Sequence, residues 1–241
     1  MTRNKIQLPP FLIKFGREEY ISQLRNDGII YFNSLNYFRK IENDEVRRDA
    51  LEGVVRIEQL RDVQLYLEGK LIARTLPSSN SHLCFHDNEN IGNVFSMYAI
   101  TENEHTDPEF KFDRRLLQFG DKLLLITDTK AFIKKIISQI ESRNLHFNLG
   151  YVKYYNKNLY SGILDPFHKP DNFNYQNEFR IYIQSKYDMS IQLEIGSIKN
   201  ITQVFDISMI ENFKIVSART ISKDQLKKAK EELRNRKELT P

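Results

Sequence analysis

The 241-residue sequence contains a single cysteine, Cys84, and no apolar run long enough to cross a bilayer. One cysteine excludes an internal disulfide and any four-cysteine zinc site, and it fits a reducing compartment. The first residues lead into Pro9 and Pro10 instead of the apolar core of a secretion signal. We therefore expect a soluble, cytoplasmic protein without a membrane partner.

Several common catalytic motifs are missing as well. The chain has no GxxxxGK[ST] phosphate loop, no GxGxxG after a predicted strand and no GxSxG nucleophile elbow. His82, Cys84 and His86 alternate, so they would share one face of a strand and could bind a metal there. The same spacing arises when strand histidines flank a buried cysteine. We favour this second interpretation and expect no metal site.

Positive charge is concentrated at the C-terminal end of the chain. Residues 223–237 hold seven basic and three acidic residues, which equals the net charge of +4 of the whole chain. A basic surface for nucleic acid is therefore limited to this tail or to local patches. We predict one domain over residues 1–221 and a basic helix over 222–241, opened by a capping box at Ser222 and Gln225. Its narrow apolar stripe would either bind a partner protein or pack on its own domain.

Strands outnumber helices in the predicted order of elements, and the two do not alternate regularly. This order predicts an α+β fold. Helices are expected before Gly28, after an N-cap at Ser34 and after an N-cap at Asp128. Residues 101–113 and 158–173 are expected to be loops, and residues 91–100 have no clear assignment. Strands are expected over 11–15, 29–32, 54–60, 63–74 with a hairpin turn at 68–70, 82–86, 123–127, 151–155, 190–195, 201–205 and 213–216.

Apolar and polar side chains alternate from Glu178 to Ile183, with the period of a half-buried strand. The apolar set, expected to face the core, is Phe179, Ile181 and Ile183. Glu178, Arg180 and Tyr182 would share the other face, with Gln176 two residues upstream. This arrangement predicts an amide and a carboxylate side by side on an accessible strand face. An edge strand with polar residues has the same pattern.

A second candidate site lies between Tyr37 and Gly53. Two adjacent aromatic residues, Tyr37 and Phe38, precede a dense set of charges of both signs: Arg39, Arg48, Asp49 and Glu52. Stacking and ion pairing by these groups would suit a polar, partly aromatic ligand. A solvated helix followed by a turn is the alternative.

In order and spacing, these segments resemble a group of bacterial and phage proteins that look like distant relatives of the ADP-ribosyltransferases. The resemblance runs through residues 13–16, 30–35, Phe38 and the charged stretch to Gly53, and then through 83–85, 97–99, 152–154 and 177–181. It implies a core formed by a split mixed or antiparallel sheet with flanking helices. It also implies NAD as the cofactor.

The resemblance assigns roles to individual residues. Lys14 stands where those enzymes usually have His or Arg, with Phe15 and Gly16 next to the nicotinamide. Ser34 belongs to the second motif, with Tyr37 or Phe38 as the stacking aromatic. The third motif is Gln176-x-Glu178, with Glu178 as the catalytic carboxylate.

The chemistry of these residue types agrees with those roles. A fixed carboxylate such as Glu178 stabilises the oxocarbenium-like state formed when the nicotinamide leaves ribose, and Gln176 would orient the acceptor. Lys14, Arg39 or Arg48 would bind the pyrophosphate, and we place Asp49, Glu52 and Arg180 at the substrate.

The resemblance implies an ADP-ribosyltransferase that acts as a toxin or phage-defence effector on RNA or a protein of the translation machinery. Such a toxin would need a neutralising antitoxin. A non-catalytic binding protein of the same fold and an NAD glycohydrolase are the alternatives.

Overall fold

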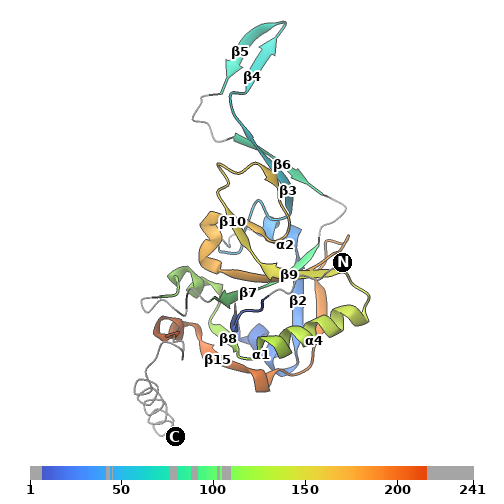
Figure 1. The fold of residues 1–241 in the computed structure, drawn as a ribbon, viewed down its shortest axis with the longest axis vertical. Coiled ribbons are helices and arrows are strands. Elements are labelled where there is room, and N and C mark those ends of the chain that lie inside the picture. The colour runs from blue at the N-terminus through green and yellow to red at the C-terminus, as the bar shows by residue number, and fades with distance from the viewer. Residues whose placement is uncertain are drawn as a thin grey trace.

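The computed structural model describes residues 7–41, 44, 46–75, 81–87, 92–101, 104 and 110–215 (Figure 1). Its largest element is an antiparallel sheet with strand order β14-β2-β7-β1-β8-β15; in addition, β13 pairs with β7, and β9 pairs with β13. The α+β prediction is confirmed. The strands are β1 (Phe11–Gly16), β2 (Ile29–Ser34), β7 (Asn93–Ile100), β8 (Lys122–Ile126), β9 (Phe147–Tyr151), β13 (Glu178–Ile183), β14 (Ile191–Glu194) and β15 (Thr202–Asp206).

Strand β7 lies at the centre of this sheet, and two different strands pair with different parts of one of its edges. We call the gap between these two strands the split. Strand β13 pairs along the other edge, from Glu178 opposite Tyr98 to Ile183 opposite Asn93. On the split edge, β1 pairs with residues 98–100 and β2 pairs only with residues 93 and 94. Residues 95–97 of β7 therefore lie between two diverging strands, with neither of them paired to this edge.

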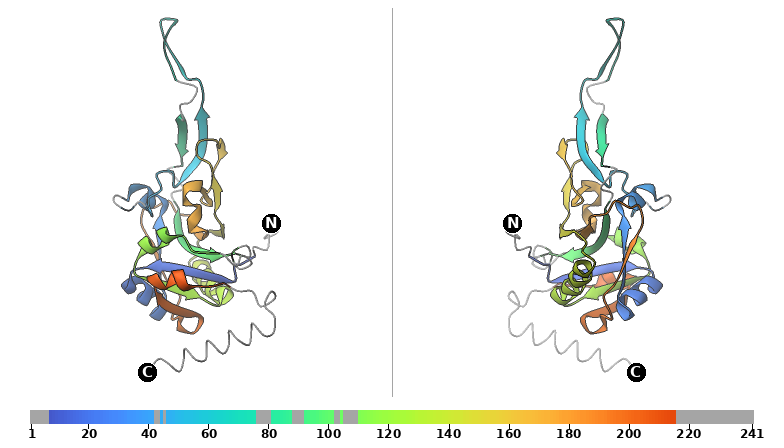
Figure 2. Two further views of the ribbon diagram at one scale, coloured as in Figure 1. Left: turned by 90° about the vertical axis from the view of Figure 1, so that its left-hand side faces the viewer. Right: turned by 90° about the vertical axis from the view of Figure 1, so that its right-hand side faces the viewer.

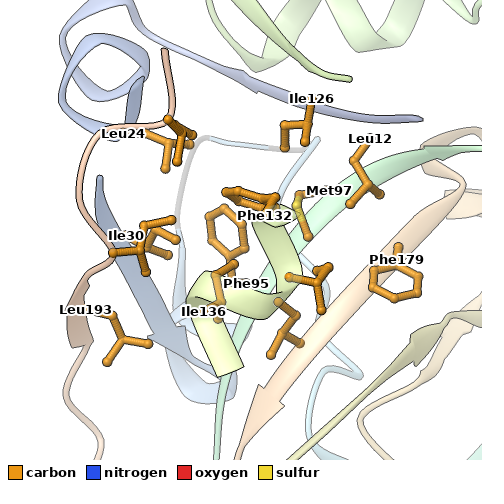
Figure 3. Close-up of a cluster of buried hydrophobic side chains, with 14 of the residues drawn as sticks. Leu12, Leu24, Ile30, Phe95, Met97, Ile126, Phe132, Ile136, Phe179 and Leu193 are labelled. Atoms are coloured by element: carbon orange, nitrogen blue, oxygen red, sulfur yellow. The ribbon is translucent and has the colours of Figure 1, made fainter. Parts of the chain in front are cut away.

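One face of the sheet is covered by helices α1 (Glu18–Asn26) and α4 (Thr129–Ser142). Figure 3 shows Phe132 and Ile136 of α4 packed beside Phe95 of β7. Phe179, Ile181 and Ile183 belong to the same buried cluster, so the predicted core face of β13 is confirmed. Burying side chains of this size stabilises the fold by about 1.5–3 kcal/mol each. The opposite face packs against two 3₁₀ helices, η1 (Arg114–Phe119) and η4 (Ile207–Asn212).

Helix ends follow the local sequence signals. Asp128 accepts a hydrogen bond from the Ala131 amide at 2.9 Å, and Ser34 accepts one from the Tyr37 amide at 3.1 Å, so both predicted N-caps are confirmed. Ser34 opens the short helix α2 (Leu35–Lys40). Gly28 follows α1 with a φ of 72°, a value that glycine adopts without strain.

An arm of β-structure projects from the body, as Figures 1 and 2 show from three directions. Strand β3 (Val54–Leu60) pairs with β6 (Ser81–His86) and β11 (Gly162–Ile163), and the hairpin of β4 (Gln64–Leu67) and β5 (Lys70–Arg74) forms the end of the arm. Glu68 and Gly69 both have positive φ values, 47° and 78°, which suit a two-residue hairpin turn. The predicted hairpin is confirmed.

Three predictions about the chain path were wrong. Residues 151–155 form two strands, because the chain leaves β9 at Val152 and enters β10 (Lys153–Tyr155), which pairs in parallel with β12 (His168–Pro170). The predicted loop 158–173 therefore contains β11, β12 and the start of the 3₁₀ helix η2 (Asp171–Gln176). Residues 213–215 form no strand, since Phe213 packs on Phe112 and Phe205 instead.

Two further predictions fall mostly or wholly outside the described residues: the loop over 101–113 and the basic helix over 222–241 with its apolar stripe. The described helices are all too short or too polar to span a bilayer, and α4, with 14 residues, is the longest of them.

Candidate functional site

A pocket of about 120 Å³ opens at the split in the sheet. Its walls are residues 13–15 of β1, Tyr31 and Asn33 of β2, and residues 94–98 of β7. Leu116, Phe119 and two further cations, Arg47 and Lys169, complete the lining together with predicted site residues from other segments. The predicted site residues that line this pocket are Lys14, Phe15, Phe38, Glu52, Gln176, Glu178 and Arg180.

Glu178 begins β13 and lies on the pocket wall with only 6 % of its surface exposed. Its Oε1 accepts a hydrogen bond from Lys169 Nζ at 2.7 Å, and its Oε2 accepts one from Arg180 Nε at 2.8 Å. Burial alone would raise the pKa of this carboxyl, but the charges and hydrogen bonds of Arg180 and Lys169 hold the pKa well below its usual range. Glu178 is therefore a fixed anion at any physiological pH.

Arg180 connects this carboxylate to the turn that holds Glu52. Its Nη1 and Nη2 donate to the two carboxylate oxygens of Glu52 at 2.8 and 2.9 Å, and Nη1 also donates to the Pro166 carbonyl at 2.6 Å. Arg180 is 2 % exposed and Glu52 is 3 % exposed. Most of the guanidinium's donors are thus used within the protein, and the pair joins β13 to the 49–53 turn.

Gln176 is not on the strand, contrary to the predicted shared face. It ends η2, and Asn177, in a left-handed conformation with φ 36°, turns the chain between Gln176 and Glu178. Its amide is nevertheless brought to the site: Oε1 accepts from Lys169 Nζ at 2.7 Å, while Nε2 donates to the Val46 carbonyl at 2.8 Å and to Tyr175 Oη at 3.1 Å. The prediction of an accessible strand face was wrong, and so was the edge-strand alternative, because β13 pairs on both sides.

Lys14 lies in the split itself. Its Nζ donates to the Ser96 carbonyl at 2.7 Å, which is one of the β7 groups that neither β1 nor β2 pairs, and it lies 4.4 Å from the centroid of the Phe95 ring. Burial and then the nearby charge of Arg47 lower the pKa of Lys14 to about 8, although Glu178 opposes this shift. Within the described part of the chain, Lys14 forms no ion pair with a carboxylate. An anionic ligand group would supply one.

Arg47 is a pocket residue that sequence reasoning missed, since Arg48 was chosen instead. Arg47 pairs with Asp44 at 2.6 Å, donates to the Phe119 carbonyl and lies 5.2 Å from the centroid of the Phe119 ring. Arg48 is exposed and does not line the pocket. Two adjacent arginines cannot be told apart without knowing which one faces the sheet.

Lys169 was missed as well. It is a buried lysine in a segment predicted to be a loop, and it lies 4.6 Å from the centroid of the Phe173 ring. The segment has no apolar period that would mark one face as interior. A lysine between Pro166 and Pro170 therefore carries no local signal of burial.

Two of the predicted cofactor residues line a second pocket of about 450 Å³. Ser34 and Tyr37 lie there with Lys40 and Asp188, and Asn33 lines both pockets. Ser34 Oγ donates to Asp188 Oδ1 at 2.5 Å, and Lys40 Nζ donates to Asp188 Oδ2 at 2.9 Å. The second motif of the resemblance is therefore next to the Glu178 pocket and not inside it.

Three other predicted residues lie outside both pockets. Gly16 ends β1, and Arg39 contacts His86 Nδ1 at 2.6 Å. Asp49 is buried and accepts a hydrogen bond from the Leu51 amide at 2.9 Å. Burial and then the charge of Glu52 raise the pKa of Asp49 to about 6, against the opposing charges of Lys169 and Arg180.

The alternating His82, Cys84 and His86 all belong to β6. Across the residues that the structure describes, no group of three His, Cys, Asp or Glu side chains has an arrangement suited to a metal ion.

The site as a whole combines a fixed carboxylate, aromatic walls and two cations, Lys14 and Arg47, on the side of the split. This set can bind a ring with an attached anionic group and can stabilise positive charge that develops beside Glu178. Comparison with models of protein families, with curated proteins and with solved structures found no match.

Proposed function

We propose that this protein is an NAD-dependent ADP-ribosyltransferase with Glu178 as its catalytic carboxylate. The observation that carries the proposal is the fixed negative charge of Glu178 on the wall of an aromatic pocket at the split of the sheet. The proposal also rests on the resemblance of the sequence to relatives of such enzymes.

Glu178 would act on the ribose attached to nicotinamide. As the N-glycosidic bond breaks, positive charge develops on the ribose, and an adjacent fixed carboxylate stabilises that state more than the ground state. A carboxylate accepts about four hydrogen bonds. Lys169 and Arg180 donate one each, so lone pairs remain for the ribose hydroxyls.

Recognition of the rest of NAD would be divided between the two pockets. Pockets for whole drug-sized ligands usually measure about 300–1,000 Å³, so the first pocket, at about 120 Å³, suits one ring. Phe15 and Phe38 supply aromatic walls, and Lys14 and Arg47 supply positive charge for the pyrophosphate. Because Asn33 lines both pockets, the remaining half of NAD would reach the second pocket at Ser34 and Tyr37.

The acceptor we propose is RNA or a protein of the translation machinery, as the resemblance to toxin and phage-defence enzymes implies. A neutralising partner would then restrain the enzyme in the cell.

Two other functions have a specific observation in their favour. Both N–H groups of the Gln176 amide are used by Val46 and Tyr175, and its oxygen already accepts a hydrogen bond from Lys169, so this amide has no free donor for an acceptor molecule. This favours an NAD glycohydrolase, in which water is the acceptor. The pairing of the buried charges of Lys169, Glu178, Arg180 and Glu52 with one another equally favours a non-catalytic ligand-binding protein, since ion networks also occur as structural elements.

One experiment separates the three functions. Purified protein is incubated with NAD labelled in the adenylate half, together with total RNA or with extract protein. A transferase moves label to one acceptor, a glycohydrolase releases free ADP-ribose with or without acceptor, and a binding protein leaves NAD intact.

The test variant is Glu178→Gln, and the matched control is Glu194→Gln, an exposed glutamate on β14. Loss of one preorganised electrostatic group typically lowers kcat by about 10²–10³-fold. We expect that loss for Glu178→Gln, with a circular dichroism spectrum like that of the wild type, and full activity for the control. Wild-type turnover by a folded Glu178→Gln variant would refute the assignment.

A further inference from the structure

The segment between β9 and β13 brings one charged side chain into the site. The chain leaves the sheet at Val152 and returns at Glu178, and the parallel pairing of β10 with β12 sets Lys169 opposite Tyr154. Lys169 is 4 % exposed, although most lysines are fully solvated. A buried ammonium group is costly unless it is paired and hydrogen-bonded, so the partners of Lys169 account for its position.

Those partners are the two residues of the third motif. Lys169 Nζ donates to Glu178 Oε1 and to Gln176 Oε1, at 2.7 Å in each case. Gln176 in turn is tied by its Nε2 to the Val46 carbonyl at 2.8 Å. A continuous chain of hydrogen bonds therefore runs from the segment at Val46 through Gln176 and Lys169 to the carboxylate of Glu178.

We propose that Lys169 is the positioning residue of the site and that Gln176 acts through it, not on the acceptor; this inference rests on the proposed function. Arg180 holds only Oε2 of Glu178. Without Lys169, the carboxylate would be free to rotate about the bond to its carbon chain, with Arg180 as its remaining side-chain donor. Lys169 thus fixes the second oxygen, and Gln176 fixes Lys169.

The kinetic test compares Lys169→Met with a control, Lys153→Met. Methionine keeps an apolar stem next to Phe173 and removes the charge, and Lys153 is an exposed lysine of the same two-stranded ribbon. A displacement of about 1 Å at a reacting group lowers the rate by about 10²-fold. We expect kcat of Lys169→Met to fall by that factor with KM nearly unchanged, and both constants of the control to stay at wild-type values.

A rescue experiment separates positioning from a general structural role. Lys169→Ala leaves a space that opens toward the pocket, which a small ammonium ion can enter. We expect n-propylammonium to restore part of kcat in Lys169→Ala and to leave the wild type unchanged. Wild-type kcat in folded Lys169→Met, or the absence of any rescue, would overturn the inference.

A second variant covers the case in which Lys169→Met does not fold. Gln176→Met removes one anchor of Lys169 while Glu178 still neutralises its charge. A fall in kcat smaller than that for loss of Glu178, with KM unchanged, supports the inference, whereas unchanged kcat contradicts it.

If the wild type does not cleave NAD, the proposed function is refuted, but the inference about Lys169 can still be tested. The inference is then decided by a double-mutant cycle of Lys169→Met and Glu178→Gln, measured by unfolding in urea without ligand. If Lys169 fixes Glu178, the decrease in the free energy of unfolding of the double variant is smaller than the sum of the decreases of the two single variants. Additive losses would show that Lys169 does not hold the carboxylate.

Discussion

The buried pair of Glu52 and Arg180 is the contact whose loss we expect to destabilise the fold most. Glu52→Gln removes a carboxylate that accepts two hydrogen bonds from Arg180, at 2.8 and 2.9 Å. Hydrogen bonds to charged groups contribute about 1.5–3 kcal/mol each. The amide oxygen of glutamine keeps one of the two bonds as a weaker, neutral acceptor.

Asp49 limits the size of this loss. The charge of Glu52 contributes to the raised pKa of Asp49, about 6, so removing Glu52 relieves this repulsion, and Asp49, whose pKa lies below the assay pH of 7, still places a negative charge near Arg180. We therefore expect Glu52→Gln to lower the free energy of unfolding by about 3 kcal/mol, at the lower end of the range of about 3–5 kcal/mol for a broken buried pair. For a chain of this length, the melting temperature would fall by roughly 6–12 °C.

The assay is urea unfolding followed by circular dichroism at pH 7, with Glu58→Gln as the control. Glu58 pairs with Arg56, but their side chains are 36 % and 57 % exposed. Exposed pairs contribute about 0–1 kcal/mol. Equal decreases in the free energy of unfolding for Glu52→Gln and Glu58→Gln would refute this prediction, because the buried pair of Glu52 and Arg180 would then contribute no more than an exposed pair.

Three further predictions concern single groups. The pKa of Lys14 is lowered to about 8 in the folded protein, so between pH 8 and 10.5 the unfolded chain binds more protons than the folded one. The free energy of unfolding therefore rises with pH across that window, and Lys14→Met should abolish this rise. Calorimetry should also show that ADP-ribose binds the wild type more weakly at pH 9, where Lys14 is mostly neutral, than at pH 7. Because the pKa of Asp49 is raised in the folded protein, the free energy of unfolding falls as the pH rises from about 4 to 6. We expect Asp49→Asn to remove this pH dependence and to raise the free energy of unfolding at pH 7, measured with urea, by about 1–3 kcal/mol. Asp128→Ala removes the cap on the Ala131 amide and should lower the unfolding free energy by about 1 kcal/mol; no change would mean that water replaces the cap.

Local patterns predicted the elements that depend on near neighbours in the chain. The caps at Ser34 and Asp128 and the turn at Glu68 and Gly69 each involve residues within a few positions of one another. The alternation after Glu178 likewise identified which side chains of β13 face the core. These features follow from the backbone geometry of a helix, a turn or a strand, which repeats over two to four residues.

Features that depend on distant neighbours were missed or misplaced. Residues 91–100 could not be assigned, because β7 is a central strand buried on both faces and such a strand does not alternate. Gln176 was placed on the strand because the signal of a left-handed residue at Asn177 is weak in the sequence. Ser34 and Tyr37 were assigned to the Glu178 pocket, whereas they line the neighbouring one.

The amino-acid sequence alone thus determined an α+β chain with a carboxylate at the start of a core strand. The tertiary structure decided what surrounds that carboxylate. Lys169 reaches Glu178 through the pairing of β12 with β10, and Arg47 contacts Phe119 from a distant part of the chain. Lys14 reaches the Ser96 carbonyl only because β1 and β2 diverge along β7. Periodicity reports which face of an element is apolar, but it does not report which segment of the chain lies opposite that face.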